Sequence, residues 1–383
     1  MSASPSRPLV VIVGMGETGV LTALNLNGCD VVGVATKQAL VSGQEVGLRL
    51  VAPGAWKKDH VTDLGRFKRL KHVTRLIGRA VSVDVEKRRL VVELAGGGRH
   101  VQPYDYLVIA SGITNGFWRD DKVVAVASIE RDIEAQAKRL AAAETIAVVG
   151  GGPTGTSIAA NLAIRYKRKA VHLFHSGDLP LPGYDAGVRK EIVRLLDSVG
   201  VRRAGGHRAE LDGRERAGTL DGGTVQWRTG QPPFEADAIV WATGASHPNS
   251  GFLPPHLLDE AGFVLTEPTL QVRGCRNIFA IGDVAQTDEH RSSARNSAYR
   301  LLAGNIAALD SGHPERMMPY LAPRNRWGSI IGTQKEGLTV YLPDGGKMRM
   351  ARWYVRLILY PFKVRRGIYG GVRSRLWHCL RGA

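Results

Sequence analysis

The stretch Leu9–Gly19 reads LVVIVGMGETG and decides the fold of the first part of the chain. Its first five residues are an unbroken apolar run with β-branched side chains, which is typical of a strand buried on both faces. The run stops at a G-x-G-x-x-G pattern formed by Gly14, Gly16 and Gly19. We expect Gly14 to permit a tight turn, Gly16 to let the backbone approach a pyrophosphate, and Gly19 to let the next helix pack closely. That helix would direct its N-terminal amides at the phosphates.

The chain repeats this unit at Thr145–Gly155, TIAVVGGGPTG, where an apolar run leads into Gly150, Gly152 and Gly155. A single G-x-G-x-x-G is weak evidence, because glycine-rich turns are common. Two strand–glycine–helix units about a domain length apart favour two dinucleotide sites over two ordinary turns. Two dinucleotides in one chain indicate that electrons pass from one to the other.

Length and composition limit the function classes. The 383 residues suffice for two to three domains with real cores, and the net charge of +17 favours anionic partners. Cys29, Cys275 and Cys379 are too few and too scattered for a disulfide framework, and no zinc spacing occurs, so we expect a reducing, cytoplasmic setting and no metal. The N-terminal sequence lacks a signal-peptide layout, and no run approaches the ~20 apolar residues that span a bilayer.

The second strand of the first unit is predicted over Asp30–Ala35. A carboxylate at the end of such a strand usually binds the adenosine ribose hydroxyls. Here the strand runs into Thr36 and Lys37 instead. Thr36 is a candidate for a hydrogen bond and Lys37 for a phosphate contact, and an ordinary loop role for both residues is an equally good interpretation.

The corresponding strand of the second unit is predicted over Ala170–Phe174 and ends at His175 and Ser176. An acid at this position would select NADH and repel a 2′-phosphate. Its replacement by His175 and Ser176 leaves both NADH and NADPH open.

Two further strands end in small residues that would let the backbone lie against a ligand. They are predicted over Tyr104–Ala110 and Ala236–Trp241. The small residues are Ala110, Ser111 and Gly112 after the first strand, and Ala242, Thr243 and Gly244 after the second. Small residues therefore follow a buried strand at two places in the chain, just as the glycine motif occurs twice.

A third signal is NIFAIGDVA, in which a strand over Asn277–Ile281 precedes Gly282 and Asp283. An Asp at that point can accept hydrogen bonds from polyol hydroxyls. A helix is predicted over Ser292–Leu309, and its N-terminal amides would stabilise negative charge. Polar candidates near that end are Ser293, Arg295, Asn296 and Ser297.

The remaining elements are predicted more coarsely. The region Gln38–Leu70 is basic and less regular, and its charges are read as a solvated face. Strands are expected over Arg79–Val85 and Arg89–Leu94, and helices over Asp132–Ala143, Thr156–Tyr166 and Tyr184–Leu196.

The C-terminal tail has a composition of its own. After Asp344 there are ten Lys or Arg and no acid, interleaved with aromatic and aliphatic residues. A helix is predicted over Arg349–Tyr360, ended by Pro361. This combination favours a segment that lies on an anionic membrane surface. Docking on the protein's own core and a nucleic-acid patch are the other interpretations, and no specific nucleic acid is expected.

The order of these motifs resembles the two-dinucleotide flavoproteins of the pyridine nucleotide–disulfide oxidoreductase superfamily. The resemblance covers nearly the whole chain and is strongest to the apoptosis-inducing-factor-like, ferroptosis-suppressor-like branch of NAD(P)H–quinone reductases, with type II NADH dehydrogenases close behind. It implies an α/β fold with two Rossmann-like domains. The FAD domain would be discontinuous, over residues 1–118 and 247–312, around an NAD(P)H domain over 119–246, with a C-terminal region over 313–383.

The resemblance also implies which residues bind each cofactor. FAD would contact Gly14, Gly16, Glu17, Thr18, Gly19, Thr36, Lys37, Arg49, Val81, Ala110, Ser111, Gly112, Gly282 and Asp283. NADH or NADPH would contact Gly150, Gly152, Pro153, Thr154, Gly155, His175, Ser176, Ala242, Thr243 and Gly244. The flavin would carry the reaction, with Ser293, Ala294, Asn296 and Ser297 as candidates near it.

Two departures from the superfamily narrow the activity. The C-x-x-x-x-C of its disulfide reductases is missing, and Ser157 stands where relatives commonly have Glu after the second glycine motif. The missing cysteines argue against disulfide reduction, and the resemblance, together with the basic aromatic tail, implies a peripheral membrane NAD(P)H–quinone oxidoreductase. A soluble reductase for a protein electron carrier or biosynthetic partner is the main alternative, and a flavoprotein that binds nucleic acid is a third.

Overall fold

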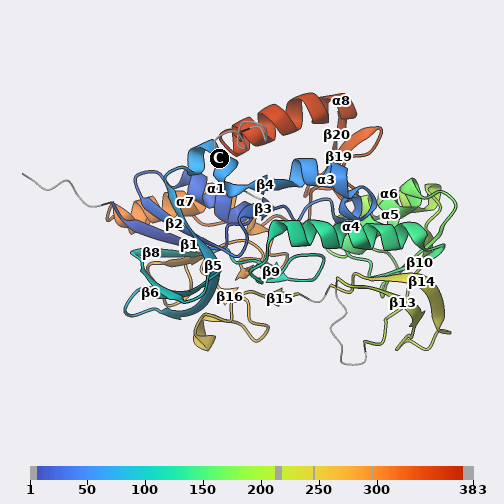
Figure 1. The fold of residues 1–383 in the computed structure, drawn as a ribbon, viewed down its shortest axis with the longest axis horizontal. Coiled ribbons are helices and arrows are strands. Elements are labelled where there is room, and N and C mark those ends of the chain that lie inside the picture. The colour runs from blue at the N-terminus through green and yellow to red at the C-terminus, as the bar shows by residue number, and fades with distance from the viewer. Residues whose placement is uncertain (1–6, 212–217, 245, 295–296, 374–383) are drawn as a thin grey trace, which may run out of the picture.

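The computed structural model describes residues 7–211, 218–244, 246–294 and 297–373. Two sheets lie toward opposite ends of the long axis of the molecule, and helices cover them (Figure 1). The first sheet has the strand order β17-β8-β1-β2-β5-β6-β7, and its first five strands are parallel. Its strands are β1 (Leu9–Val13), β2 (Asp30–Ala35), β5 (Val73–Asp84), β6 (Arg89–Leu94), β7 (Arg99–Pro103), β8 (Tyr106–Ile109) and β17 (Ile278–Ala280).

Apolar runs account for the centre of this sheet. Val10, Val11 and Ile12 of β1 are fully buried, as expected for a strand covered on both faces. Helix α1 (Glu17–Asn25) comes directly after the first glycine motif and packs against α7 (Ala298–Asp310). The buried strand predicted from the apolar run, and the helix predicted after the glycine motif, are therefore both present.

The second sheet has the order β12-β11-β10-β14-β13 and is parallel except for β13. Its helices bury apolar faces against it, with Ile158, Leu162 and Ile192 fully inaccessible. The elements are α4 (Val126–Ala142), β10 (Thr145–Val149), α5 (Pro153–Arg165), β11 (Ala170–Phe174), α6 (Ala186–Ser198), β12 (Arg202–Ala204), β13 (Leu220–Val225) and β14 (Phe234–Trp241).

The chain crosses between the two units twice, side by side. Strand β9 (Ile113–Thr114) leaves the first unit and pairs antiparallel with β15 (His247–Pro248), which returns to it. Strand β17 then completes the first sheet beside β8. The first unit is thus discontinuous, and the predicted architecture of two Rossmann-like units is confirmed.

The region predicted to be less regular instead forms short helices, strands and 3₁₀ turns. It contains β3 (Ala39–Val41), α2 (Val46–Val51), α3 (Pro53–His60) and β4 (Val61–Asp63), and then 3₁₀ turns at Leu64–Arg66 and Lys68–Leu70. Helix α2 packs on α4 and α5 of the second unit. Short helices of this kind depend on tertiary packing, so periodicity in the sequence carries little signal for them.

The region after β15 returns to the first unit and then covers both units. It comprises a 3₁₀ turn at Pro255–Leu257, the paired β16 (Val264–Leu265) and β18 (Ala285–Gln286), 3₁₀ turns at Ser292–Ala294 and Pro314–Arg316, and the hairpin of β19 (Gly337–Tyr341) with β20 (Lys347–Ala351). The helix predicted from Ser292 begins only at Ala298, because Ser297 has a left-handed φ of 56°.

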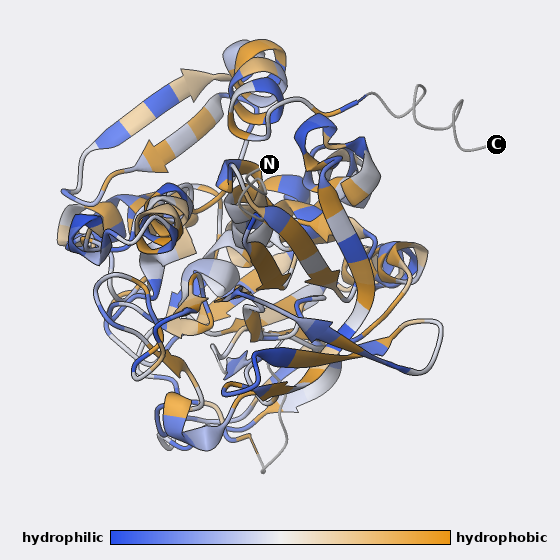
Figure 2. Cartoon of the chain, turned by 90° about the vertical axis from the view of Figure 1, so that its left-hand side faces the viewer, coloured by the Kyte–Doolittle hydropathy of each residue, from blue (hydrophilic) through white to orange (hydrophobic). Residues whose placement is uncertain are grey.

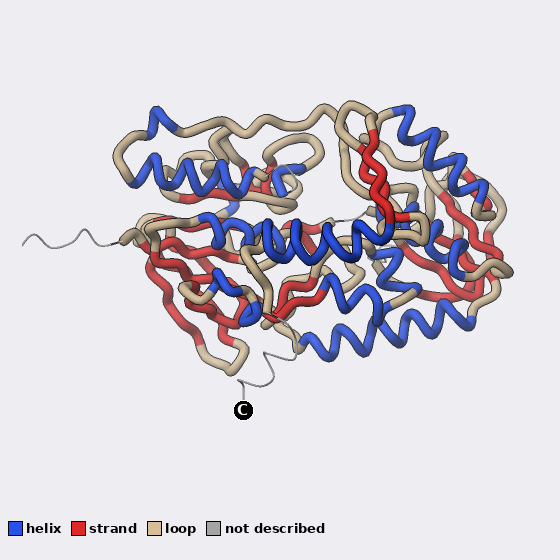
Figure 3. The backbone as a smooth tube through the Cα atoms, turned by 90° about the horizontal axis from the view of Figure 1, so that it is seen from above, coloured by secondary structure: helices blue, strands red, loops and turns tan. Residues whose placement is uncertain are grey.

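The tail forms one helix, which we call the tail helix: α8 (Arg352–Tyr354) continued by a π-helical segment over Val355–Ile368. The prediction was wrong at both ends, since residues 349–351 lie in β20 and Pro361 lies inside the helix. The wider π turn explains the second error, because it relieves the clash of the proline ring with the carbonyl four residues earlier. The tail helix lies over the region between the two sheets (Figure 3). None of the helices in the described ranges has the length and hydropathy of a membrane span.

Candidate functional site

The first glycine motif is held by packing at its first and third positions. Gly14 has φ of +99°, and a Cβ there would lie 2.4 Å from the carbonyl oxygen of Ala110. A Cβ on Gly19 would lie 1.9 Å from the carbonyl oxygen of Gly14. A Cβ on Gly16 would meet no atom within 4 Å. Gly14 and Gly19 therefore have structural reasons to be glycine, whereas Gly16 borders open space, as a phosphate cradle requires.

The second motif repeats this geometry. Gly150 has φ of +126°, and a Cβ there would lie 1.9 Å from the carbonyl oxygen of Ala242. A Cβ on Gly155 would lie 1.9 Å from the carbonyl oxygen of Gly150, and one on Gly152 would meet nothing. Pro153 opens α5 directly after this motif, a position where its missing N–H costs no helical hydrogen bond.

Each of the two small-residue segments, 110–112 and 242–244, contains a buried hydroxyl without a hydrogen-bond partner. Ser111 Oγ and Thr243 Oγ1 are inaccessible to solvent and have no hydrogen-bond partner. Each lies one residue after the carbonyl that a Cβ on Gly14 or Gly150 would strike. A buried hydroxyl without a partner is costly, by about 1–3 kcal/mol. Both hydroxyls are therefore suited to a ligand that lies along the neighbouring glycine motif.

The residues at the ends of the two second strands differ. Lys37 Nζ, after β2, lies 3.1 Å from Asp120 Oδ1 and donates to the Asp120 carbonyl oxygen. This ion pair neutralises the positive charge of Lys37, which was the predicted phosphate contact. Thr36 accepts a hydrogen bond of 3.4 Å from Lys37.

His175, after β11, keeps one free ring nitrogen. Its Nδ1 lies 2.7 Å from the Gly177 carbonyl oxygen, so Nδ1 carries the hydrogen and Nε2 is the acceptor. Nε2 is buried without a partner, and burial lowers the pKa of the ring. A neutral imidazole with a free acceptor suits a ribose hydroxyl, whereas Ser176 is exposed.

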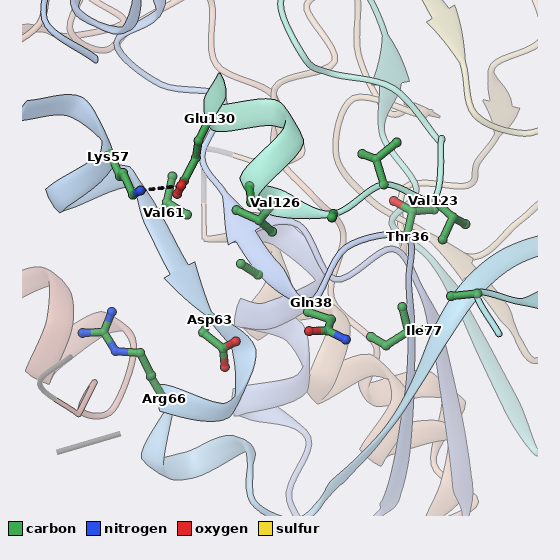
Figure 4. A pocket seen from close by; sticks show the side chains of 15 residues that line it. Thr36, Gln38, Lys57, Val61, Asp63, Arg66, Ile77, Val123, Val126 and Glu130 are labelled. Atoms are coloured by element: carbon green, nitrogen blue, oxygen red, sulfur yellow. Dashed lines mark hydrogen bonds and ion pairs between the residues drawn. The ribbon is translucent and has the colours of Figure 1, made fainter. Parts of the chain in front are cut away.

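A cavity of about 710 Å³ opens beyond Thr36, at the carboxyl end of β2 and beside Ile77 of β5 (Figure 4). Ile77 and Val126 line its apolar wall, and an ion pair between Lys57 and Glu130 lies along its edge. Val81, farther along β5, is the extra residue of a β-bulge, which frees its backbone from the ladder. Thr36, which the sequence predicted as an FAD contact, is among the residues that line this cavity.

Asp283 lies in the turn after β17, beside the start of α1. It forms an ion pair with Arg119. A Cβ on the preceding Gly282 would lie 3.2 Å from Thr18 Oγ1, so this turn lies against the start of α1. Ser293 is fully buried, and its Oγ accepts a hydrogen bond of 2.9 Å from the Gly282 amide. Ser293 thus positions the turn that carries Asp283.

The other predicted residues fall into three groups. Glu17 accepts hydrogen bonds from Ser42 Oγ and Gln44 Nε2, at 2.9 and 3.1 Å. Thr154 lies in the first turn of α5. Around the start of α7, Ala294 and Ser297 are described, whereas Arg295 and Asn296 lie outside the described residues.

Arg49 is fully buried in α2. Its guanidinium donates to the carbonyl oxygens of Phe117 and Ser42 at 2.5 and 2.6 Å and lies 4.2 Å above the Trp56 ring. Burial, and next the charge of Arg119, lower its pKa to about 9. The Nε–H of Arg49 is also buried and has no hydrogen-bond partner.

A buried acid and histidine lie among residues that were not predicted to belong to the site. Glu45 and His60 form an ion pair of 3.4 Å, with side chains 8% and 5% exposed. Glu45 has a left-handed φ of 52° just before α2. The sequence did not predict the burial of Glu45 and His60. Both residues lie in a basic stretch, and their burial depends on the tail helix, which is distant in the sequence.

The residues present fit two dinucleotides. Each glycine motif offers open space at its second glycine and an unpaired hydroxyl on the adjacent strand end. The first unit also carries the cavity beside Thr36 and the Asp283 turn next to Thr18, which are compatible with FAD. The second leads to the neutral His175, which suits NADH and does not exclude NADPH.

Comparison with known proteins agrees with this interpretation. The family model described as pyridine nucleotide-disulphide oxidoreductase matches residues 8–300. Oxidoreductase ptaL of Pestalotiopsis fici is 32% identical over 56% of this chain, and the chain spans 56% of that relative's length. Type II NADH:quinone oxidoreductase Ndh of Mycobacterium tuberculosis is 25% identical over 82% of this chain and 76% of its own.

Two further similarities support the expected branch and fold. Ferroptosis suppressor protein 1 of Mus musculus is 27% identical over 82% of each chain. The structure of NDH2 from Plasmodium falciparum in complex with NADH superposes with a TM-score of 0.69, at 14% identity, over 95% of this chain and 97% of that one. The resemblance stated from the motifs is thus confirmed, and the chain belongs to the pyridine nucleotide-disulphide oxidoreductase family.

Proposed function

We propose that this protein is an FAD-dependent NAD(P)H:quinone oxidoreductase that works at an anionic membrane surface on the cytoplasmic side. The observation that carries the proposal is the pair of glycine motifs with matching unpaired hydroxyls, Ser111 and Thr243. The M. tuberculosis relative described as a type II NADH:quinone oxidoreductase supports the choice of acceptor. The predicted domain limits at residues 118, 246 and 312 stay predictions.

The chain itself would bind and orient the cofactors. When bound, FAD would accept a hydride from NAD(P)H and pass the electrons to the quinone. The amides at the N-termini of α1 and α5 would stabilise the two pyrophosphates. Asp283 would accept hydrogen bonds from the ribityl hydroxyls in place of part of its contact with Arg119. The other cofactor contacts that we assign are the residues predicted from the motifs.

The tail helix has one face that suits a membrane. Its exposed apolar side chains are Trp353, Leu357, Phe362 and Ile368, between 42% and 64% accessible. Arg352, Arg356, Lys363 and Arg366 are exposed on the same helix. Figure 2 shows the helix nearly end-on at the top of the view, with hydrophobic and hydrophilic residues intermixed. Each basic residue near an anionic surface contributes roughly 1 kcal/mol.

The other face of the tail helix is docked on the protein. Val355 is fully buried, and Arg365 binds Asp59 at 2.8 Å. Beyond the helix, Tyr369 packs edge-on against Phe67 and Val372 bridges to Phe67. The predicted alternative of docking on the core thus holds for one face only, and the docked face fixes which residues a membrane would meet.

Vesicle flotation tests the membrane part. The full chain is expected to float with anionic vesicles and to stay behind with neutral ones. Replacing Trp353, Leu357 and Phe362 by Ser is expected to weaken binding at least tenfold, because each buried side chain contributes about 1.5–3 kcal/mol. The matched control replaces Met318 and Leu321, which are 63% and 80% exposed on another segment, by Ser. Equal flotation of the two variants contradicts the assignment.

A soluble reductase for a protein electron carrier is the second candidate. The net charge of +17 favours it, because a basic surface attracts acidic carriers. The discriminating experiment reduces the flavoprotein anaerobically with NAD(P)H and then adds a short-chain quinone or an acidic ferredoxin. Reoxidation by the quinone supports the proposal. Reoxidation by the carrier alone would replace it with this candidate.

A further inference from the structure

A buried cluster of hydrogen-bonding side chains joins three distant parts of the chain. Glu45 Oε1 accepts hydrogen bonds from the amide and hydroxyl of Thr333, both at 3.1 Å, and lies 3.4 Å from Tyr360 OH. Glu45 Oε2 lies 3.4 Å from His60 Nε2. The His60 ring is stacked on Trp56 and meets Tyr360 edge-on. Burying an acid and a histidine together is expensive, so the pair calls for a reason.

The residues on either side of Glu45 contact both dinucleotide-binding units. Two residues before Glu45, Gly43 packs against the Arg119 side chain that pairs with Asp283. Gln44 donates to Glu17 of the first glycine motif.

On the other side of Glu45, Gly47 lies against the second unit. A Cβ on Gly47 would lie 2.5 Å from the Ser157 carbonyl oxygen and from Asn161 Nδ2, both on α5. Glu45 is thus set between α1 and α5, the helices that begin at the two motifs.

The outer end of the cluster reaches the surface beneath the tail helix. Tyr360 belongs to that helix, and the neighbouring Asp59–Arg365 ion pair is about one-third exposed. The charged groups that face Glu45 and Tyr360 are thus His60 and Asp59 from α3, with Arg365 from the tail helix. The Tyr360 side of the cluster is therefore the side on which neighbouring charged groups reach solvent.

Quinone reduction takes up protons as well as electrons. The overall reaction is NAD(P)H + H⁺ + quinone → NAD(P)⁺ + quinol, in which the hydride supplies two electrons and one proton. The second proton comes from water. Among the described residues of the cluster, the His60 imidazole can both accept and donate a proton, and its Nε2 lies 3.4 Å from the Glu45 carboxylate.

We propose that Glu45 and His60 form the proton-relay pair for the acceptor, with Thr333 and Tyr360 as positioning residues. In this relay His60 would give its proton to a quinone oxygen as the quinone takes up the electron pair, and would take another proton from water, while the Glu45 carboxylate stabilises the imidazolium. The inference rests on the proposed quinone reductase function. Burial raises the pKa of Glu45, but the hydrogen bonds from His60 and Thr333 outweigh it, so its pKa falls below 4.5.

The kinetic test compares two acceptors on the flavin-loaded enzyme. Quinone takes up protons on reduction, and ferricyanide takes electrons alone. Glu45→Gln and His60→Gln are each expected to lower quinone reduction roughly 10- to 100-fold and to change its pH profile, since positioned acids contribute about 10²–10⁴ in rate. Ferricyanide reduction is expected to stay unchanged, which also shows that the variants fold and bind both cofactors. Glu45→Asp is expected to restore part of the quinone rate.

The matched control is Glu191→Gln. Glu191 also accepts hydrogen bonds from a tyrosine and a cation, Tyr341 at 3.2 Å and Lys347 at 2.6 Å, but on α6 and the β19–β20 hairpin. It is expected to leave both acceptor rates unchanged. A second readout needs no turnover: infrared titration of the Glu45 carboxylate, whose midpoint is expected to rise when His60 is replaced by Gln.

The outcomes separate the two proposals. Quinone reduction by Glu45→Gln at the wild-type rate and pH profile, or an infrared midpoint that His60→Gln leaves in place, overturns the relay. An equal loss with ferricyanide also overturns it, because the pair would then serve folding or cofactor binding. Wild-type enzyme that reduces ferricyanide but no quinone refutes the proposed function, and the relay with it.

Discussion

The two glycine motifs have nearly the same backbone geometry and differ in the side chains at the end of the next parallel strand. Gly14 and Gly150 are both held at positive φ against the end of a neighbouring strand. After β2, Lys37 is tied up by Asp120, whereas after β11 the ring of His175 keeps a free Nε2. The shared backbone suits the pyrophosphate that two dinucleotides have in common. The strand ends are where we expect selection between cofactors.

The largest expected effect comes from the third glycine of each motif. Gly19→Ala and Gly155→Ala would each place a methyl group 1.9 Å from a backbone oxygen, so the motif must shift. Overpacking of this kind costs about 1–3 kcal/mol, or roughly 5- to 200-fold in affinity. Gly19→Ala is expected to lower the flavin content of the purified protein, and Gly155→Ala to weaken NAD(P)H binding while flavin stays.

The second glycines provide the control for that experiment. Gly16→Ala and Gly152→Ala meet no protein atom, so the melting temperature of the cofactor-free protein should not change. Their methyl groups would still intrude on the phosphates, and calorimetric titration is expected to show weaker binding. If cofactor affinity is the same as in the wild type, the open space at these glycines is not a phosphate cradle.

An intermediate effect is expected at His175. His175→Asp introduces a carboxylate that accepts hydrogen bonds from both ribose hydroxyls and repels a 2′-phosphate. The ratio of kcat/KM for NADH to that for NADPH should rise at least tenfold, or about 1.4 kcal/mol. The companion Lys37→Asp should leave this ratio unchanged. A response to Lys37→Asp alone would show that we have assigned the two sites the wrong way round.

The pH dependence of the His175 site has a definite sign. Because burial lowers its pKa from 6.5, the ring is neutral at neutral pH and becomes charged only as the pH falls through the lowered value. Protonation removes the Nε2 acceptor and adds a charge that attracts a 2′-phosphate. Preference for NADPH over NADH should therefore increase below pH 6.5, and this change should vanish in His175→Asn.

The smallest expected effects concern Ser111 and Thr243. Removing an unpaired buried hydroxyl, by Ser111→Ala or Thr243→Val, should leave the cofactor-free protein equally stable or slightly more stable. Binding of FAD or NAD(P)H, respectively, should weaken by about 0.5–1.5 kcal/mol. A marked loss of thermal stability without cofactor would show that the hydroxyls have protein partners instead.

The sequence predicted correctly those strands and glycine turns whose structure depends on residues close together in the chain. Strands β2 and β11 have the predicted bounds, because short apolar runs between turns leave few alternatives. The glycine motifs were found for the same reason. The order of the 38–70 region was missed, since α2 and α3 owe their stability to packing on α4 and α5.

The rest of the site depends on contacts between residues far apart in sequence. Lys37 meets Asp120 across 83 residues, and Glu45 meets Tyr360 across 315. Neither pairing leaves a pattern in the sequence. The proline inside the tail helix misled the prediction because a wide helical turn is a tertiary accommodation that helix-breaking rules do not include.

Flavin content and then anaerobic reduction test the central claim most directly. We predict that purified protein is yellow, or takes up one FAD per chain, and that NADH or NADPH bleaches it in the absence of oxygen. Protein that stays colourless after incubation with FAD, or a bound flavin that neither nicotinamide reduces, would contradict the claim that the chain holds two dinucleotides within electron-transfer reach.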